Sequence, residues 1–153
     1  MWWRRLRYVL VLIALCAIAT CPAAKRSCNA RNRALEADDL LDVLSDKVRA
    51  VARQTGKVPP LAAGPTPQRM CCDETDGICE ASDATWNTPA WRALGFSIDG
   101  AYRYTYSYVP AADGRSAVVR AVGDLDCDGK RSLYEVAVTV DGKRTWTRRD
   151  PYE

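Results

Sequence analysis

The sequence predicts an α+β fold in which a long N-terminal helix packs on an antiparallel sheet of four or five strands. Three features lead to this prediction. The first third of the chain is apolar and then amphipathic, with no glycine before Gly56. Residues 56–90 are rich in proline, glycine and cysteine, and short alternating segments separated by Asp-Gly pairs follow them. We therefore divide the chain into a signal or membrane anchor at 1–24, an amphipathic helical spine at 25–55, a Cys/Pro-rich linker at 56–90 and a β headpiece at 91–153.

The net positive charge of the chain comes from its start. Three of the 22 basic residues, Arg4, Arg5 and Arg7, precede the apolar segment, so the remaining 19 match the 19 acidic residues. A neutral body offers no electrostatic surface for a polyanion, and we expect no nucleic-acid partner.

The N-terminal segment has the pattern of an export signal or a membrane anchor. After the basic start, residues 8–24 carry no charge, and such a run lies at the short end of a transmembrane span. A signal peptidase could instead cut after the small residues Ala17 and Ala19, and Cys21 is a candidate for lipid attachment. We expect an inner-membrane anchor with a periplasmic or extracellular C-terminal domain. The alternative is secretion.

Residues 34–53 have the period of an amphipathic helix that ends before Gly56 and Pro59. Because only Pro22 interrupts the preceding residues, one helix could run from about residue 8 to residue 53. Packing on the chain's own sheet is the expected role of its apolar stripe, and a coiled coil is the alternative. The stripe consists of Ala37, Leu41, Leu44, Val48 and Val51.

Four cysteines are candidates for disulfide bonds: Cys71, Cys72, Cys79 and Cys127. Zinc binding is less favoured, because the chain has no histidine and adjacent cysteines do not have the usual ligand spacing. Three pairings are open, of which Cys71 with Cys72 is the least favourable. Cys127 could be joined to a linker cysteine.

The last third of the chain has β-type alternation. Strands are predicted at residues 94–98, 102–108, 116–122 and 133–140, with a last strand that ends near residue 147. The second strand carries tyrosine at every other position. This row could be a binding stripe, but the simpler interpretation is the half-buried face of a strand, with hydroxyls that reach water. Trp86 and Trp91 are expected to cover one end of the sheet, and a carbohydrate-binding face is the alternative.

Residues 124–135 match the twelve-position calcium loop. Carboxylates occupy positions 1, 3 and 5, Gly129 stands at position 6, where the backbone turns sharply, and later positions offer further oxygen ligands. Strands are predicted on both sides, so this is a calcium loop within a hairpin and not an EF-hand. A solvated acidic turn is the alternative. The candidate metal ligands are Asp124, Asp126, Asp128, Lys130 through its carbonyl, Ser132 and Glu135.

The sequence contains no recognisable enzyme site. It has no histidine for general base catalysis, no Gly-x-Ser-x-Gly elbow and no phosphate-binding glycine loop. We therefore expect a protein that is not an enzyme.

Four stretches carry a resemblance to a known family: the Ala- and Ile-rich run that meets a proline at 15–23, the loop at 56–59, the segment at 91–96 and the acidic loop at 123–130. Together they resemble type IV pilins and pseudopilins, the subunits of type IV pili and type II secretion systems. The resemblance implies a long helix on an antiparallel sheet, membrane anchoring before assembly, and other pilin-like subunits as partners. Calcium at Asp124, Asp126, Asp128 and Glu135 would fit the loop of some pseudopilins.

The chain departs from this family at the processing site. Prepilins carry a glycine before the cleaved bond and a glutamate soon after it, whereas this chain has no glycine before Gly56 and no glutamate before Glu36. The resemblance therefore implies a degenerate relative without prepilin processing, anchored permanently in the cell envelope. The alternative is a secreted or lipid-anchored calcium-binding module outside any filament.

Overall fold

The computed structural model describes residues 31–152. The predicted anchor at 1–24, the lipid candidate Cys21 and the first part of the predicted long helix lie outside the described residues. Within the described range, none of the helices combines the length and apolar character needed to cross a membrane.

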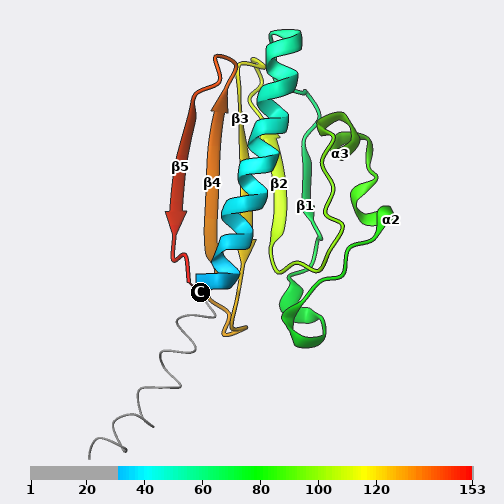
Figure 1. Ribbon diagram of the computed structural model, residues 1–153, viewed down its shortest axis with the longest axis vertical. Helices are drawn as coiled ribbons and strands as arrows, with labels where there is room; N and C mark the ends of the chain where they lie inside the picture. The colour runs from blue at the N-terminus through cyan, green and yellow to red at the C-terminus, as the bar shows by residue number, and fades with distance from the viewer. Residues whose placement is uncertain (1–30, 153) are drawn as a thin grey trace, which may run out of the picture. The chain divides into compact units, whose positions relative to one another are not determined.

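Five antiparallel strands form one sheet in the order β1-β2-β3-β4-β5 (Figure 1). Short turns join the last four strands, as the Asp-Gly pairs predict, whereas residues 67–104 connect β1 to β2. The antiparallel sheet of the predicted α+β fold is thereby confirmed. The strands are β1 (Ala63–Thr66), β2 (Thr105–Pro110), β3 (Ser116–Gly123), β4 (Ser132–Thr139) and β5 (Arg144–Arg149).

A helix at residues 31–55 lies along one face of this sheet (Figure 1). Four of the five residues of its predicted stripe, Ala37, Leu41, Leu44 and Val48, are fully buried against the sheet, whereas Val51 is only partly buried. Alternate residues of the strands form the other side of this core, and packing on the chain's own sheet is confirmed. The buried strand residues include Tyr106, Tyr108, Val119, Val136 and Val138.

The row of tyrosines is more deeply buried than the sequence analysis predicts. Tyr104, Tyr106 and Tyr108 are fully buried under the helix, so they form neither a half-exposed face nor a binding stripe. The Tyr108 hydroxyl donates a hydrogen bond to the Pro59 carbonyl (2.6 Å), which replaces the water that the prediction assigned to it.

The predicted strand at 94–98 is wrong. Residues up to Leu94 belong to the helix α3 (Pro89–Leu94), and residues 95–98 are irregular. The Thr88 hydroxyl caps the helix by accepting a hydrogen bond from the Trp91 amide (3.3 Å), and Gly95 ends it with a left-handed φ of 61°. Proline at the first helical position and glycine after the last favour a helix over a strand here.

The linker at 56–90 is more ordered than its composition suggests. It contains the edge strand β1, two 3-10 turns η1 (Cys71–Asp73) and η2 (Thr75–Gly77), and the short helix α2 (Asp83–Trp86). Gly64 makes β1 possible, since a Cβ there would lie 2.2 Å from the Tyr106 carbonyl oxygen.

Glu36 joins the helix to the sheet inside this interface. One carboxylate oxygen accepts hydrogen bonds from the Arg103 amide (2.7 Å) and the Tyr106 hydroxyl (3.3 Å), and the other lies 3.4 Å from the Arg103 guanidinium. Burial raises the pKa of Glu36 above its usual 4.5 despite these partners. Further out, Arg144 and Arg148 of β5 pair with helix aspartates, including Asp38.

Leu44→Ala tests the helix–sheet core. Removing this fully buried side chain should lower the free energy of unfolding by about 2–5 kcal/mol, because it leaves a cavity against the sheet. The neighbouring Val43 is 47% exposed, so Val43→Ala should change the free energy of unfolding by less than about 0.5 kcal/mol. Urea denaturation measures both variants, and equal losses would contradict the packing described above.

Glu36→Gln tests the buried carboxyl group through the pH dependence of stability. A raised pKa means that the folded chain holds the proton more tightly than the unfolded chain. The carboxyl group therefore contributes stability at low pH that is lost as the pH rises through its folded pKa. Relative to Glu36→Gln, the parent should become less stable as the pH rises from the usual carboxyl value of 4.5 toward neutral.

Urea denaturation across this pH range measures the difference between parent and variant. Glu80→Gln removes a carboxylate from an exposed position and controls for the change in net charge. A parent that gains stability relative to Glu36→Gln as the pH rises would contradict the assignment.

Candidate metal-binding loop

The predicted calcium loop connects β3 to β4, and its ends are fixed by the sheet. Gly123 pairs with Ser132 at the last position of the β3–β4 ladder. Between them, the carboxylates of Asp124, Asp126 and Asp128 have oxygens that lie within 4.8 Å of one another. Asp124 is partly buried and the other two are exposed. The three carboxylates are thus close enough to contact one cation.

Asp124 shapes the turn from inside. Its carboxylate oxygens accept hydrogen bonds from the amides of Asp128 (3.1 Å) and Gly129 (2.9 Å). Gly129 has a φ of +93°, the left-handed conformation that the sequence position requires. The backbone therefore folds around the first aspartate, as position 1 of a calcium loop demands.

The loop is also held from the helix and from the core. Leu125 is 6% exposed, and its carbonyl accepts a hydrogen bond from the Arg33 guanidinium (2.6 Å). The role of Arg33 was not predicted, because its sequence distance from the loop gives no signal. The contact fixes the start of the loop against the first turns of the described helix.

Ser132 and Glu135 lie elsewhere than the calcium-loop spacing predicts. Ser132 is buried as the first residue of β4 and donates a hydrogen bond to the Gly123 carbonyl (3.2 Å). Glu135 lies on the opposite face of the same strand, where it forms an ion pair with Arg120 of β3. Successive residues of a strand alternate between its faces, so positions 132 and 135 diverge.

Lys130 contacts the triad through Asp128. Its amide donates to one oxygen of Asp128 and its ammonium group to the other, both at 2.8 Å. These hydrogen bonds lower the pKa of Asp128 and neutralise part of the local charge. Of the six predicted ligands, the structure therefore gathers the three aspartates, with Lys130 beside them.

Two disulfides fix the surroundings of the loop, and the disulfide interpretation of the four cysteines is confirmed. Cys71 is bonded to Cys79 (S–S 2.05 Å) and Cys72 to Cys127 (S–S 2.07 Å). The bond Cys72–Cys127 ties the middle of the acidic loop to η1, so the predicted link between Cys127 and a linker cysteine is present. The first bond is buried and holds Cys71 of η1 in the core.

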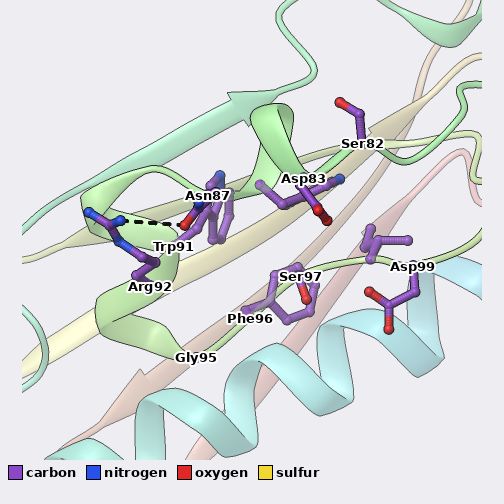
Figure 2. Close-up of a pocket in the computed structure, with 11 residues that line it drawn as sticks. Ser82, Asp83, Asn87, Trp91, Arg92, Gly95, Phe96, Ser97 and Asp99 are labelled. Atoms are coloured by element: carbon purple, nitrogen blue, oxygen red, sulfur yellow. Dashed lines mark hydrogen bonds between the residues drawn. The ribbon is translucent and has the colours of Figure 1, made fainter.

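A hollow of about 400 Å³ lies beside α2 and α3 (Figure 2). Its rim is polar, with Asp83 and Asp99 among its residues, and Arg92 donates a long hydrogen bond to Asn87 (3.5 Å). Trp86 and Trp91 line it, but they are 3% and 0% exposed. A sugar ring needs an exposed aromatic face to stack on, so the predicted core role of these tryptophans is confirmed over the carbohydrate alternative.

The buried tryptophans organise this end of the molecule. The rings of Trp86 and Trp91 lie 5.3 Å apart between centroids, and the Trp91 indole donates a hydrogen bond to Thr66 (2.8 Å). The two side chains thereby connect α2 and α3 to the edge strand β1, which matches the prediction that they cover one end of the sheet.

Comparison with known proteins adds no relative: no family model, no curated protein and no solved structure matches the chain.

Proposed function

We propose that this chain is a non-enzymatic, pilin-like protein of the cell envelope, held at a membrane by its N-terminal segment. The observation that carries this proposal is the amphipathic helix at residues 31–55, which lies along one face of an antiparallel sheet. A basic start and an uncharged segment at residues 8–24 precede that helix in the chain. This is the order of parts that the resemblance to type IV pilins and pseudopilins implies, including a long helix that continues into the membrane.

The disulfides support a location outside the cytoplasm. Two bonds among the four C-terminal cysteines require an oxidising compartment to form and persist. An export signal at the N-terminus would deliver the domain to such a compartment. Other pilin-like subunits are the partners that this proposal favours, with the membrane as the site of the anchor.

Calcium is the cation that we propose for the loop. Three carboxylates whose oxygens lie within 4.8 Å of one another repel each other, and a bound cation would reduce this repulsion. Calcium accepts six to eight oxygens in flexible geometry, so carbonyls and water would complete the aspartate set. With Ser132 and Glu135 directed elsewhere, a weak site is expected, in the range of about 10⁻⁴ to 10⁻³ M that extracellular modules show.

The alternative function is a secreted or lipid-anchored calcium-binding module that belongs to no filament. It shares the loop and the disulfides with the first proposal and differs in the fate of the N-terminal segment. The two functions are therefore separated by the chemistry of the mature N-terminus.

N-terminal sequencing of the full chain, recovered from the membrane and soluble fractions of the producing cell, tests the anchor. The pilin-like proposal predicts that residues 8–24 remain attached and that the protein stays in the membrane fraction. A mature start at Thr20, or a lipidated Cys21, would instead support the secreted or lipid-anchored module.

Calorimetry with calcium tests the loop. In about 10 mM calcium, a site of the expected affinity should stabilise the parent by about 1.4–2.7 kcal/mol and raise its melting temperature. Asp124→Ala should remove this response, because it deletes the carboxylate that organises the turn. Asp113→Ala changes an aspartate of the β2–β3 turn and should leave the calcium response intact. A melting temperature of the parent that does not change with calcium would contradict calcium binding by the loop.

A further inference from the structure

The two disulfides differ sharply in their surroundings. Cys71 and Cys79 are 1% and 6% exposed, and Cys79 also forms two backbone hydrogen bonds with Tyr102 (2.8 and 3.0 Å). By contrast, Cys127 is exposed and Cys72 is partly exposed. Thiol–disulfide exchange requires an attacking thiolate to reach one of the sulfurs. The greater exposure of Cys72–Cys127 to solvent therefore favours thiol–disulfide exchange at this bond.

The backbone at Cys127 gives this bond a conformational consequence. Cys127 has a φ of +61°, a left-handed conformation that residues with a Cβ seldom adopt. The bond to Cys72 holds it there, beside Gly77, where a Cβ would lie 3.3 Å from the Cys127 sulfur. Once the bond opens, Cys127 is free to leave both this conformation and this contact.

The rest of the loop limits how far such a change can spread. Gly123 and Ser132 remain paired in the sheet, and Arg33 still holds the Leu125 carbonyl. Residues 126–131 lie between these anchors, and the disulfide is the covalent link that joins them to η1. Opening the bond would thus remove the covalent tie of this short exposed segment to η1 and leave the sheet intact, with the hydrogen bonds of Asp128 and Gly129 to Asp124 as its remaining hold.

We infer that Cys72–Cys127 is an exchangeable latch on the β3–β4 loop, which a dithiol reductant opens while Cys71–Cys79 stays closed. The partner class is a dithiol, such as a thioredoxin-like oxidoreductase. The first thiolate of the dithiol attacks the Cys127 sulfur and forms a mixed disulfide, while Cys72 leaves as a thiolate. The second thiol of the dithiol then attacks the mixed disulfide and releases Cys127. Both protein cysteines end as thiols, and the dithiol is oxidised to its disulfide with the transfer of two electrons and two protons.

Peptide mapping of the full chain tests the order of opening. The folded protein is treated with dithiothreitol for increasing times in EDTA, alkylated, unfolded and cut with trypsin. Cys71, Cys72 and Cys79 all lie in the peptide 70–92, whereas Cys127 lies in 121–130. The latch predicts an early product in which the two peptides are separate and each carries one alkyl group. The bond Cys72–Cys127 should open at least roughly tenfold faster than Cys71–Cys79.

The same time course in guanidinium is the control, because unfolding removes the difference in access and should bring the two rates together. A linked peptide pair with two alkyl groups on 70–92, or loss of both bonds at one rate in the folded protein, would overturn the inference. So would a rate difference that persists in guanidinium, since it would not come from the fold.

Native proteolysis tests the release of the loop. After selective reduction, trypsin should cut the Lys130–Arg131 bond roughly tenfold faster, with no change at Arg115 in the β2–β3 turn. The double variant Cys72→Ser, Cys127→Ser should show the same acceleration without reductant. Unchanged cleavage in both the reduced protein and the variant would show that the bond does not act as a latch.

Discussion

The helix at residues 31–55 and the inner face of the sheet bury one another, and neither surface is stable without the other. The helix presents Leu41, Leu44 and Val48, each of which gains about 1.5–3 kcal/mol from leaving water. The sheet presents a row of tyrosines, whose hydroxyls need partners once the helix excludes water. Glu36 supplies such a partner for Tyr106 and the Pro59 carbonyl for Tyr108, whereas the buried Tyr104 hydroxyl has no hydrogen-bond partner among the described residues.

The period of the sequence was sufficient to predict the parts of the fold that are locally determined. The helix stripe and the strands β3, β4 and β5 repeat every 3.6 or every two residues, and their turns contain Asp-Gly or Gly. The segment around Leu94 has no such clear period, and a short apolar run fits a strand as well as a helix. The capping residues Thr88 and Gly95 indicate a helix here more clearly than the apolar run indicates a strand.

The edge strand β1 and the depth of the tyrosine row could not be predicted from local pattern. Proline and glycine within Ala63–Thr66 argue against a strand, and only an edge position tolerates them. That position depends on the backbone of Tyr106, which is distant in the chain. Similarly, alternation shows that tyrosines share one face, but complete burial depends on where the helix lies.

The acidic loop shows how a motif and a secondary structure compete for the same residues. The spacing of Asp124, Asp126 and Asp128 and the turn at Gly129 appear in the structure as the motif predicts. The last positions of the motif, however, also begin β4, and the alternation of the strand places Ser132 and Glu135 on opposite faces. A helix after the loop would have brought position 12 back toward position 1, which is why an EF-hand can use it. In this chain the ladder with β3 takes precedence, and Arg120 becomes the partner of Glu135.

The 3-10 turn η1 carries two adjacent cysteines whose bonds lead in different directions. Cys71 is buried and bonds to Cys79, next to the Tyr102 bridge, whereas Cys72 bonds to the exposed loop residue Cys127. The linker therefore contributes to the position of the acidic loop, in addition to the strands β3 and β4. The linker has short regular elements, which Cys71–Cys79 and the hydrogen bond of Trp91 to Thr66 of β1 hold together. Through Cys72 the linker is joined covalently to the acidic loop, even though it contributes no carboxylate to the triad.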